Sequence, residues 1–250
     1  MAFVLDRGRA HDVPEEALGP GAEGVLSVDR YSAYKAMEQV KDGSILRSFC
    51  WAHVRRDFLD AARSWPAHEV WAMGWVERIG LLYELDGERR AASEEKGPED
   101  AALRGHVAEM ARQRDLELAD ERIHPARRGP LASLREHWDG LTVFVDHPEA
   151  PLDNNTAERM LRGPVVLRKN SRGSGAVWAG ELAAMLFSIF QTLCLWRLNP
   201  RVWLEEYLRA CAEAGGKAPA APDEFLPWCM TEQRRREWSS AKEAEAEDSS

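Results

Sequence analysis

The sequence is poor in cysteine, which excludes two kinds of small-protein scaffold. Four cysteines are spread over 250 residues, and none forms a Cys-x-x-Cys pair. Neither a disulfide framework nor a cysteine-rich zinc finger is therefore indicated. A reducing compartment, the cytoplasm, fits this cysteine usage best.

Long hydrophobic runs are also absent. The longest, residues 182–196, is interrupted by Ser188, Gln191 and Thr192 and is shorter than the roughly 18 residues that suggest a membrane span. We therefore expect a buried helix there and no membrane partner. The N-terminus, MAFVLDRGRA, reaches charged residues before any apolar stretch could act as a signal sequence, so export is not expected.

Positive charge is not in excess. The chain has 33 basic and 42 acidic side chains and a formal net charge of −9, which disfavours a protein that coats nucleic acid indiscriminately. A local basic patch is compatible with this balance. Hydrophobic residues make up 44% of the chain and there are ten tryptophans, enough to fill the core of one large domain or two modest ones.

Short apolar runs predict a few buried strands. Residues 2–5, 24–28 and 45–50 form such runs, and Asp29 follows the second of them directly. In open α/β sheets ligands collect at the carboxyl ends of the strands, so Asp29 is a candidate functional residue. A turn or helix-capping aspartate is the alternative interpretation.

Helical patterns fill most of the remaining chain. Pro14 suits the first turn of a short helix, and residues 51–62 and 71–82 carry apolar side chains at helical spacing. Residues 91–102 are small, charged and proline-bearing, as expected of a solvated link, and charged helical sequence continues after them to Trp138.

A polar segment, Asp153 to Thr156, offers capping oxygens for a helix that carries Glu158. Gly163-Pro164 is expected to end that helix, and residues 168–175 to form a basic, glycine-rich loop before an apolar helix from about residue 181. A last amphipathic helix follows Asn199-Pro200. Beyond it we expect a flexible linker at 215–222, a docked anchor at 225–228 and a disordered acidic end.

Asp29 and Glu158 are candidates for one carboxylate site. Magnesium chemistry on phosphodiesters needs hard oxygen ligands, and carboxylates from separate elements supply them. A basic run without acidic residues follows Glu158, as expected beside a phosphate backbone; it consists of Arg159, Arg162, Arg168, Lys169 and Arg172. A solvated basic face is the alternative.

The same segments carry a family resemblance. Residues 153–162 (DNNTAERMLR), 166–170 (VLRKN) and 173–175 (GSG) resemble the DNN-x-x-ER-x-x-R, RKN and GSG block of the insertion-sequence-66 family of bacterial transposases. Upstream, 28–34 (VDRYSAY) is similar to the family's D-x-Y-x-x-Y segment and 50–56 (CWAHVRR) to its CWAH-x-RR segment. The matching segments follow the expected order over about residues 3 to 230.

The resemblance implies an RNase H-like core with an Asp-Asp-Glu triad that binds Mg²⁺ or Mn²⁺ and performs DNA strand cleavage and transfer. Asp29 matches the second aspartate and Glu158 the glutamate, both catalytic and metal-binding, and His53 is an accessory residue near the site. The motif residues expected to contact transposon ends and target DNA are Arg55, Arg56, Asn154, Asn155, Arg159, Arg162, Arg168, Lys169 and Arg172.

One departure concerns the family's first catalytic aspartate, which lies on a strand before the segment where this sequence begins. Asp6 is not a substitute, because its neighbours align with the following strand. The expected fold is therefore α/β and mostly helical: a partial RNase H-like core that lacks its first strands, with a helical insertion and C-terminal helices. We expect a truncated transposase fragment, inactive alone; a non-catalytic DNA-binding or regulatory module is the alternative.

The expected organisation has five parts. Residues 1–60 form the partial core with Asp29, 61–147 the helical insertion and 148–214 the rest of the catalytic core. Residues 215–230 are a linker and anchor, and 231–250 a disordered charged tail. A second copy or a full-length transposase is an expected partner besides DNA.

Overall fold

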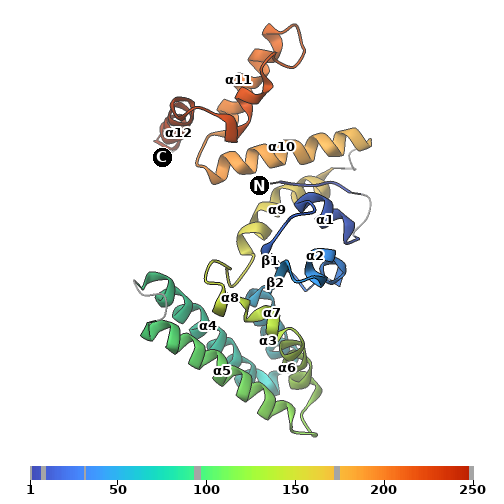
Figure 1. Cartoon of the computed structure of the whole chain (residues 1–250), viewed down its shortest axis with the longest axis vertical. Helices are drawn as coiled ribbons and strands as arrows, with labels where there is room; N and C mark the ends of the chain where they lie inside the picture. Colours follow the sequence, from blue (N-terminus) through green and yellow to red (C-terminus); the bar gives the residue numbers. More distant parts are fainter. Residues whose placement is uncertain (1, 7–9, 31, 93–96, 172–174, 248–250) are drawn as a thin grey trace. The chain divides into compact units, whose positions relative to one another are not determined.

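The computed structural model describes residues 2–6, 10–30, 32–92, 97–171 and 175–247. The chain divides into two compact units, Gly8–Glu158 and a second unit that combines Met1–Arg7 with Arg159–Ser250. In the described residues the fold is mostly helical, with one two-stranded sheet (Figure 1). The expectation of a mostly helical α/β chain is therefore confirmed.

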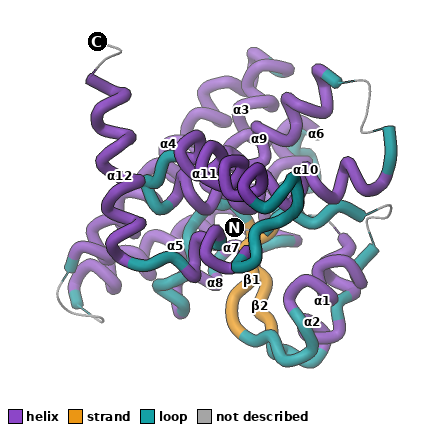
Figure 2. Tube along the Cα trace, turned by 90° about the horizontal axis from the view of Figure 1, so that it is seen from above, coloured by secondary structure: helices purple, strands orange, loops and turns teal. Residues whose placement is uncertain are grey.

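The sheet belongs to the unit Gly8–Glu158. Strand β1 (Gly24–Val28) runs parallel to β2 (Ile45–Phe49), with Gly24 opposite Ile45 and Val28 opposite Phe49 (Figure 2). Helix α1 (Asp12–Leu18) precedes β1, and η1 (Ser32–Ala36) and α2 (Glu38–Lys41) connect the two strands. Two of the three predicted strands are thus confirmed.

The prediction of a strand at residues 2–5 is wrong, because these residues contact a helix instead of a sheet. The Phe3 backbone N–H donates to Ser188 Oγ at 2.8 Å, and the Phe3 ring packs against Phe187. Both partners belong to α10 (Val177–Leu195) of the second unit.

Helices pack against the sheet and build the main core with it. They are α3 (Trp51–Ser64), η2 (Pro66–His68), α4 (Glu69–Ala91), α5 (Pro98–Leu118), α6 (Pro125–Glu136), α7 (Trp138–Leu141) and α8 (Val143–Asp146). One buried cluster joins Val28 and Phe49 of the strands to Phe58, Trp75 and Leu131 of the helices. Residues 61–147, expected to be an insertion, therefore share one core with the strands. The five-part division of the chain stays a prediction.

A buried ionic network stiffens the helical part of this unit. Arg89 on α4 is 6% exposed; its Nη2 contacts Asp86 Oδ1 at 2.5 Å and the Phe144 carbonyl at 3.1 Å. Arg90 Nη2 donates to the Ala150 carbonyl at 2.7 Å. These bonds attach α8 and the chain that follows it to α4, because a buried charge is stable only with its partners in place.

The second unit is built from helices: the rest of α9 (Asn155–Asn170), α10, α11 (Pro200–Glu213), η3 (Pro222–Phe225), η4 (Pro227–Cys229) and α12 (Glu232–Glu247). Trp203, Phe225 and Trp238 belong to its buried cluster. Trp203 Nε1 donates to the Phe225 carbonyl at 2.6 Å, so the anchor predicted at 225–228 docks on α11.

Three expectations for this unit are wrong. Helix α9 continues through Gly163-Pro164 to Asn170. Gly163 lies inside this helix, where a Cβ would be 3.3 Å from the Phe187 ring, so the glycine allows close packing against α10. Residues 168–170 are consequently helical and not a loop. The tail expected to be disordered forms α12 over Glu232–Glu247, and Trp238 is buried.

A further correction concerns α10, for which the sequence predicts burial. Only Thr192 and Leu193 are buried among its residues. By length and composition α10 is the single described helix that could cross a membrane. One such helix is weak support for a membrane span, because core and surface helices can have the same length and composition.

Candidate functional site

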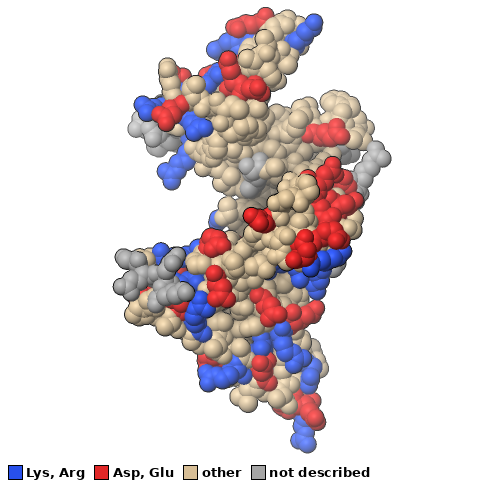
Figure 3. All heavy atoms as spheres, viewed as in Figure 1, with Lys and Arg blue, Asp and Glu red and all other residues tan. Residues whose placement is uncertain are grey.

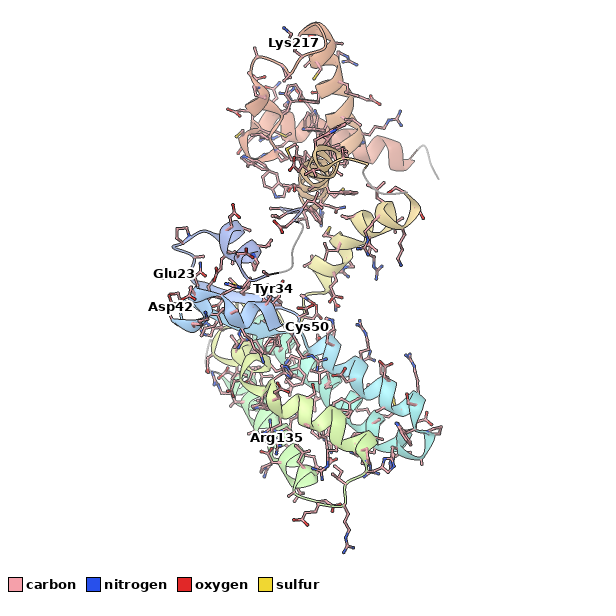
Figure 4. The ribbon with its side chains drawn as sticks, turned by 90° about the vertical axis from the view of Figure 1, so that its right-hand side faces the viewer. Glu23, Tyr34, Asp42, Cys50, Arg135 and Lys217 are labelled. Atoms are coloured by element: carbon pink, nitrogen blue, oxygen red, sulfur yellow. The ribbon has the colours of Figure 1, made fainter. Side chains whose placement is uncertain are left out.

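The first feature of the site is a contact between α3 and α9. His53 Nε2 lies 3.3 Å from Glu158 Oε1, and both side chains are partly exposed. Helix α3 begins directly after Cys50, a buried residue at the end of β2 (Figure 4). Since Val54 and Phe58 anchor α3 in the core, His53 is held at the first turn of a well-packed helix.

The start of α9 is attached to the same end of α3. The Trp51 backbone N–H donates to the Leu152 carbonyl at 2.9 Å, and Leu152 is buried. Asp153 Oδ1 then accepts from the Asn155 backbone N–H at 3.0 Å, which caps the helix as its polar residues predict. The Glu158 carboxylate is therefore positioned by backbone bonds and a cap as well as by His53.

Asp29 lies directly after β1, as predicted, and is exposed. Its neighbour Arg30 is attached to two helices. Arg30 Nη1 lies 2.8 Å from Asp57 Oδ2 on α3 and donates to Ser133 Oγ on α6 at 2.6 Å. The loop that carries Asp29 is therefore held against α3.

Helix α3 connects the two candidate carboxylate segments. His53 and Asp57 are four residues apart, so they lie on one face of α3 with Cβ atoms about 5–6 Å apart. One binds the Glu158 side chain and the other the neighbour of Asp29. Sequence reasoning missed Arg30 and Asp57, although the four-residue spacing from His53 was a signal that could have identified Asp57.

Metal binding by the expected ligands, Asp29 and Glu158, stays a prediction. Within the described ranges, no group of three or more His, Cys, Asp or Glu side chains could hold a metal ion. Mg²⁺ and Mn²⁺ prefer several oxygen ligands, whereas Glu158 contacts an imidazole. These residues by themselves therefore do not fit a divalent-metal site.

Two buried polar atoms near Glu158 stand out. His53 Nδ1 and Asn154 Oδ1 are both buried and have no hydrogen-bond partner among the described residues. Such atoms are rare in folded proteins because each costs desolvation free energy. Two buried polar atoms beside Glu158 are therefore without a hydrogen-bond partner, as are six others among the described residues.

A groove lies beside these residues in the same unit. Its volume is about 590 Å³, and α3, α4 and the start of α9 line it. Arg55, Arg56 and Asn155, three of the residues expected to bind DNA, are part of its wall. Tyr83 donates to Asp153 Oδ2 at 3.1 Å in this wall; partial burial, followed by the Asp153 charge, raises the pKa of the Tyr83 hydroxyl far above its usual value.

The remaining basic residues of the prediction lie on α9 in the second unit. Arg159, Arg162, Arg168 and Lys169 are all exposed. Arg172 lies outside the described residues. The exposed cations therefore follow one helix, which extends farther than the sequence pattern suggested.

Acidic side chains gather elsewhere in the unit Gly8–Glu158. Red spheres cover the region of α1 and α2 in Figure 3, where Glu15, Glu38 and Asp42 line a shallow depression. On the helical bundle of the same unit, acidic and basic side chains are interspersed. A polyanion is repelled by the α1–α2 face, so it would approach this unit from another side.

Comparisons with known proteins agree with the motifs. Residues 1–182 match the family described as "Transposase IS66 family". Among curated proteins of Sinorhizobium fredii (strain NBRC 101917 / NGR234), uncharacterized protein y4jD is 32% identical over 236 residues, which are 91% of this chain and 45% of y4jD. Uncharacterized protein y4hP is 27% identical over 260 residues, 97% of this chain and 44% of y4hP.

The chain thus spans less than half the length of the curated relatives that it matches. No solved structure matches it. Since the family match covers most of the sequence, including both the His53 and the Glu158 motifs, the chain belongs to the IS66 family of transposases.

Proposed function

We propose that this chain acts in DNA transposition, with Asp29 and Glu158 as catalytic carboxylates and His53 as an accessory residue. The observation that carries the proposal is the 3.3 Å contact between His53 Nε2 and Glu158 Oε1. It joins two segments that the sequence separates widely but that both match transposase motifs. Polar side chains far apart in sequence are brought together in this way at catalytic sites.

The proposed reaction is DNA strand cleavage and transfer by the Asp-Asp-Glu chemistry of an RNase H-like core. Parallel strands β1 and β2, with Asp29 at a carboxyl end, are compatible with such a core. In the unit Gly8–Glu158, the carboxylates would act at the phosphodiester while Arg55 and Arg56 bind neighbouring phosphates.

Mg²⁺ or Mn²⁺ is the ion that we propose for this site. When bound, such an ion supplies charge stabilisation at phosphate oxygens. Because the described side chains alone do not fit an ion, binding would require further oxygen ligands. Calorimetric titration of the protein with Mg²⁺, in the absence and in the presence of DNA, tests whether DNA supplies these further ligands.

DNA is the proposed partner of the exposed α9 cations as well. Arg159, Arg162, Arg168 and Lys169 are suited to phosphate contacts, and Arg172 and the Asn154 and Asn155 side chains complete the proposed set. Location in the cytoplasm and assembly with a second copy or a full-length transposase are further parts of the proposal.

A second candidate function is a non-catalytic DNA-binding or regulatory module derived from a transposase. The observation that favours it is the absence of a three-ligand metal group from the residues that the structure describes. Such a module would bind DNA through its arginines without cleaving it.

One experiment separates the two candidates. Purified chain is incubated with supercoiled plasmid that carries the element ends, in Mg²⁺ or Mn²⁺, and strand nicks are counted. In contrast to the sequence expectation of a fragment that is inactive alone, the catalytic proposal expects nicking by the purified chain, and this nicking should fall at least about 100-fold in Asp29→Asn and Glu158→Gln, as the loss of a charge-stabilising group does. The exposed Glu136→Gln on α6 is the control. Binding without nicking in the wild type would contradict the catalytic proposal and favour the module.

A further inference from the structure

The groove beside the candidate site contains an arginine that no transposase motif includes. Ala52, Arg55, Arg56, Leu59 and Arg63 all line it, at spacings that place them on one face of α3. The groove therefore continues along the helix, away from the end where Asn155 and Glu158 begin α9.

The charge in the groove is positive and accessible. Arg55 and Arg56 are exposed, and Arg63 is 75% exposed with a weak ion pair, Nη1 to Asp60 Oδ1 at 3.3 Å. An exposed pair of this kind contributes little free energy, so Arg63 can exchange it for a phosphate. The other acid in the wall, Asp153, already accepts from Tyr83 and Asn155.

The spacing of the cations matches several phosphates. Arg63 lies eight positions after Arg55 and seven after Arg56. On a helix that rises ~1.5 Å per residue, these separations are about 10–12 Å. One DNA strand carries a phosphate about every 3.4 Å along a duplex axis and less regularly when unpaired. The row of arginines is therefore long enough to contact more than one phosphate of an unpaired strand, whose neighbouring phosphates lie farther apart than this axial rise.

The size and floor of the groove favour an unpaired strand. A volume of about 590 Å³ is in the range of ligand pockets, which suits one unpaired strand better than a whole double helix. Leu59 contributes an apolar surface, and the Tyr83 ring is half-buried in the wall. A basic groove with an aromatic side chain is the combination that binds single strands, because bases stack on the ring while cations bind the backbone.

We propose that this groove binds a single DNA strand that flanks the bond to be cut, with Arg63 and Tyr83 as strand-binding residues in addition to Arg55 and Arg56. The inference rests on the proposed function for the choice of DNA. Because Asn155 lines the groove and begins the helix that carries Glu158, a strand in the groove would lead directly toward the candidate carboxylate.

Fluorescence anisotropy with a labelled oligothymidine of about 12 nucleotides tests the proposal against a duplex of the same length. We expect tighter binding of the single strand. Arg63→Ala should weaken that binding about fivefold and reduce the salt slope by about 0.7, the value for one phosphate neutralised on a single strand. Arg112→Ala on α5, which removes an exposed arginine outside the groove, is the matched control and should change neither quantity.

A pair of variants tests the aromatic contact. Tyr83→Phe keeps the ring and removes the bond to Asp153, whereas Tyr83→Ala removes both. We expect Tyr83→Phe to bind the oligonucleotide within about twofold of wild type and Tyr83→Ala to bind about tenfold more weakly, because the base then has no ring on which to stack. Circular dichroism melting of each variant separates impaired binding from impaired folding.

Several outcomes overturn the inference: duplex bound as tightly as the single strand, Arg63→Ala equal to Arg112→Ala, or Tyr83→Phe as weak as Tyr83→Ala. The readout is independent of nicking. Asp29→Asn and Glu158→Gln abolish the proposed catalysis without removing a groove cation. Intact single-strand binding in a protein that never nicks would therefore refute the catalytic proposal alone.

Discussion

His53 Nε2 lies 3.3 Å from Glu158 Oε1 and so connects the first turn of α3 with the first turn of α9. A second contact, from Arg30 to Asp57, attaches the loop after β1 to the same face of α3 one turn later. Helix α3 is therefore the common support of both candidate carboxylate segments. Its own position is held by the buried side chains of Trp51, Val54 and Phe58.

The His53 contact predicts a positioning role for the imidazole. His53→Ala should lower the rate of nicking about 10–100-fold with little change in the KM for DNA, because a displaced carboxylate slows the chemical step more than binding. His53→Gln, whose amide can still donate to Glu158, should restore part of the rate. Equal losses in the two variants, or an effect on KM alone, would contradict the role.

The Arg30–Asp57 pair predicts a stability effect in the loop that carries Asp29. The two side chains are 22% and 34% exposed, and Arg30 also donates to Ser133. Arg30→Ala should lower the free energy of unfolding by about 1–2 kcal/mol, since it removes a charged hydrogen bond that is partly shielded from water. Urea denaturation measures this, with Lys41→Ala, from a fully surface pair, as the control that should stay within about 0.5 kcal/mol.

The buried Asp86–Arg89 network predicts a larger effect. Both side chains are 4% exposed, so Asp86→Ala leaves the buried Arg89 with the more distant Asp100 carboxylate at 3.9 Å and should destabilise the unit by about 3–5 kcal/mol. Arg112→Ala, on the exposed surface of α5, should cost less than about 0.5 kcal/mol. Thermal melting followed by circular dichroism distinguishes them; similar melting temperatures for the two variants would show that the network is dispensable.

His68 predicts a pH dependence of stability. Arg127 Nε donates to His68 Nδ1 at 3.2 Å, and the His124 ring lies 4.5 Å away between centroids. Partial desolvation, and then the charges of His124 and Arg127, hold the pKa of His68 below its ordinary 6.5. The unfolded chain therefore binds the proton more readily, so this contribution to stability is present above pH 6.5 and is lost as the pH falls through the lowered pKa.

The measurement is the melting temperature between about pH 5 and about pH 8 for the wild type and for His68→Gln. The wild type should lose more stability than the variant on acidification. A parallel decline in both proteins would mean that other groups are responsible.

The α9 cations predict a sequence-independent contribution to DNA binding. Exchange of Arg159, Arg162, Arg168 and Lys169 for glutamine should weaken duplex binding equally for specific and random sequences. The salt slope should fall by about 0.9 for each phosphate that is no longer neutralised. Unchanged affinity and slope would show that these exposed side chains form only a solvated face.

The sequence by itself determined the parts of this protein that depend on neighbours along the chain. Brief apolar runs predicted β1 and β2, and apolar spacing predicted α3 and α4. Asp153 predicted the start of α9, because a capping carboxylate satisfies backbone donors of its own first turn. The motif order likewise identified the family before any contact was known.

Only the tertiary structure decided which of these local elements meet. The local preference of proline is to end a helix, yet α9 continues through Pro164, and Gly163 beside it packs against Phe187. The run at residues 2–5 has the composition of a strand, but its backbone donor binds Ser188 on a helix. Local preferences amount to about 1 kcal/mol for most residues, so packing between distant segments can override them.

The same reason applies to the candidate site. The sequence marked His53 and Glu158 as members of separate motifs, but their contact depends on α3 being buried against the core and on Leu152 binding the start of α3. No motif predicted the Arg30–Asp57 ion pair or the part that Arg63 and Tyr83 take in the groove. Their partners come from different helices, and only folding of the whole unit brings those helices together.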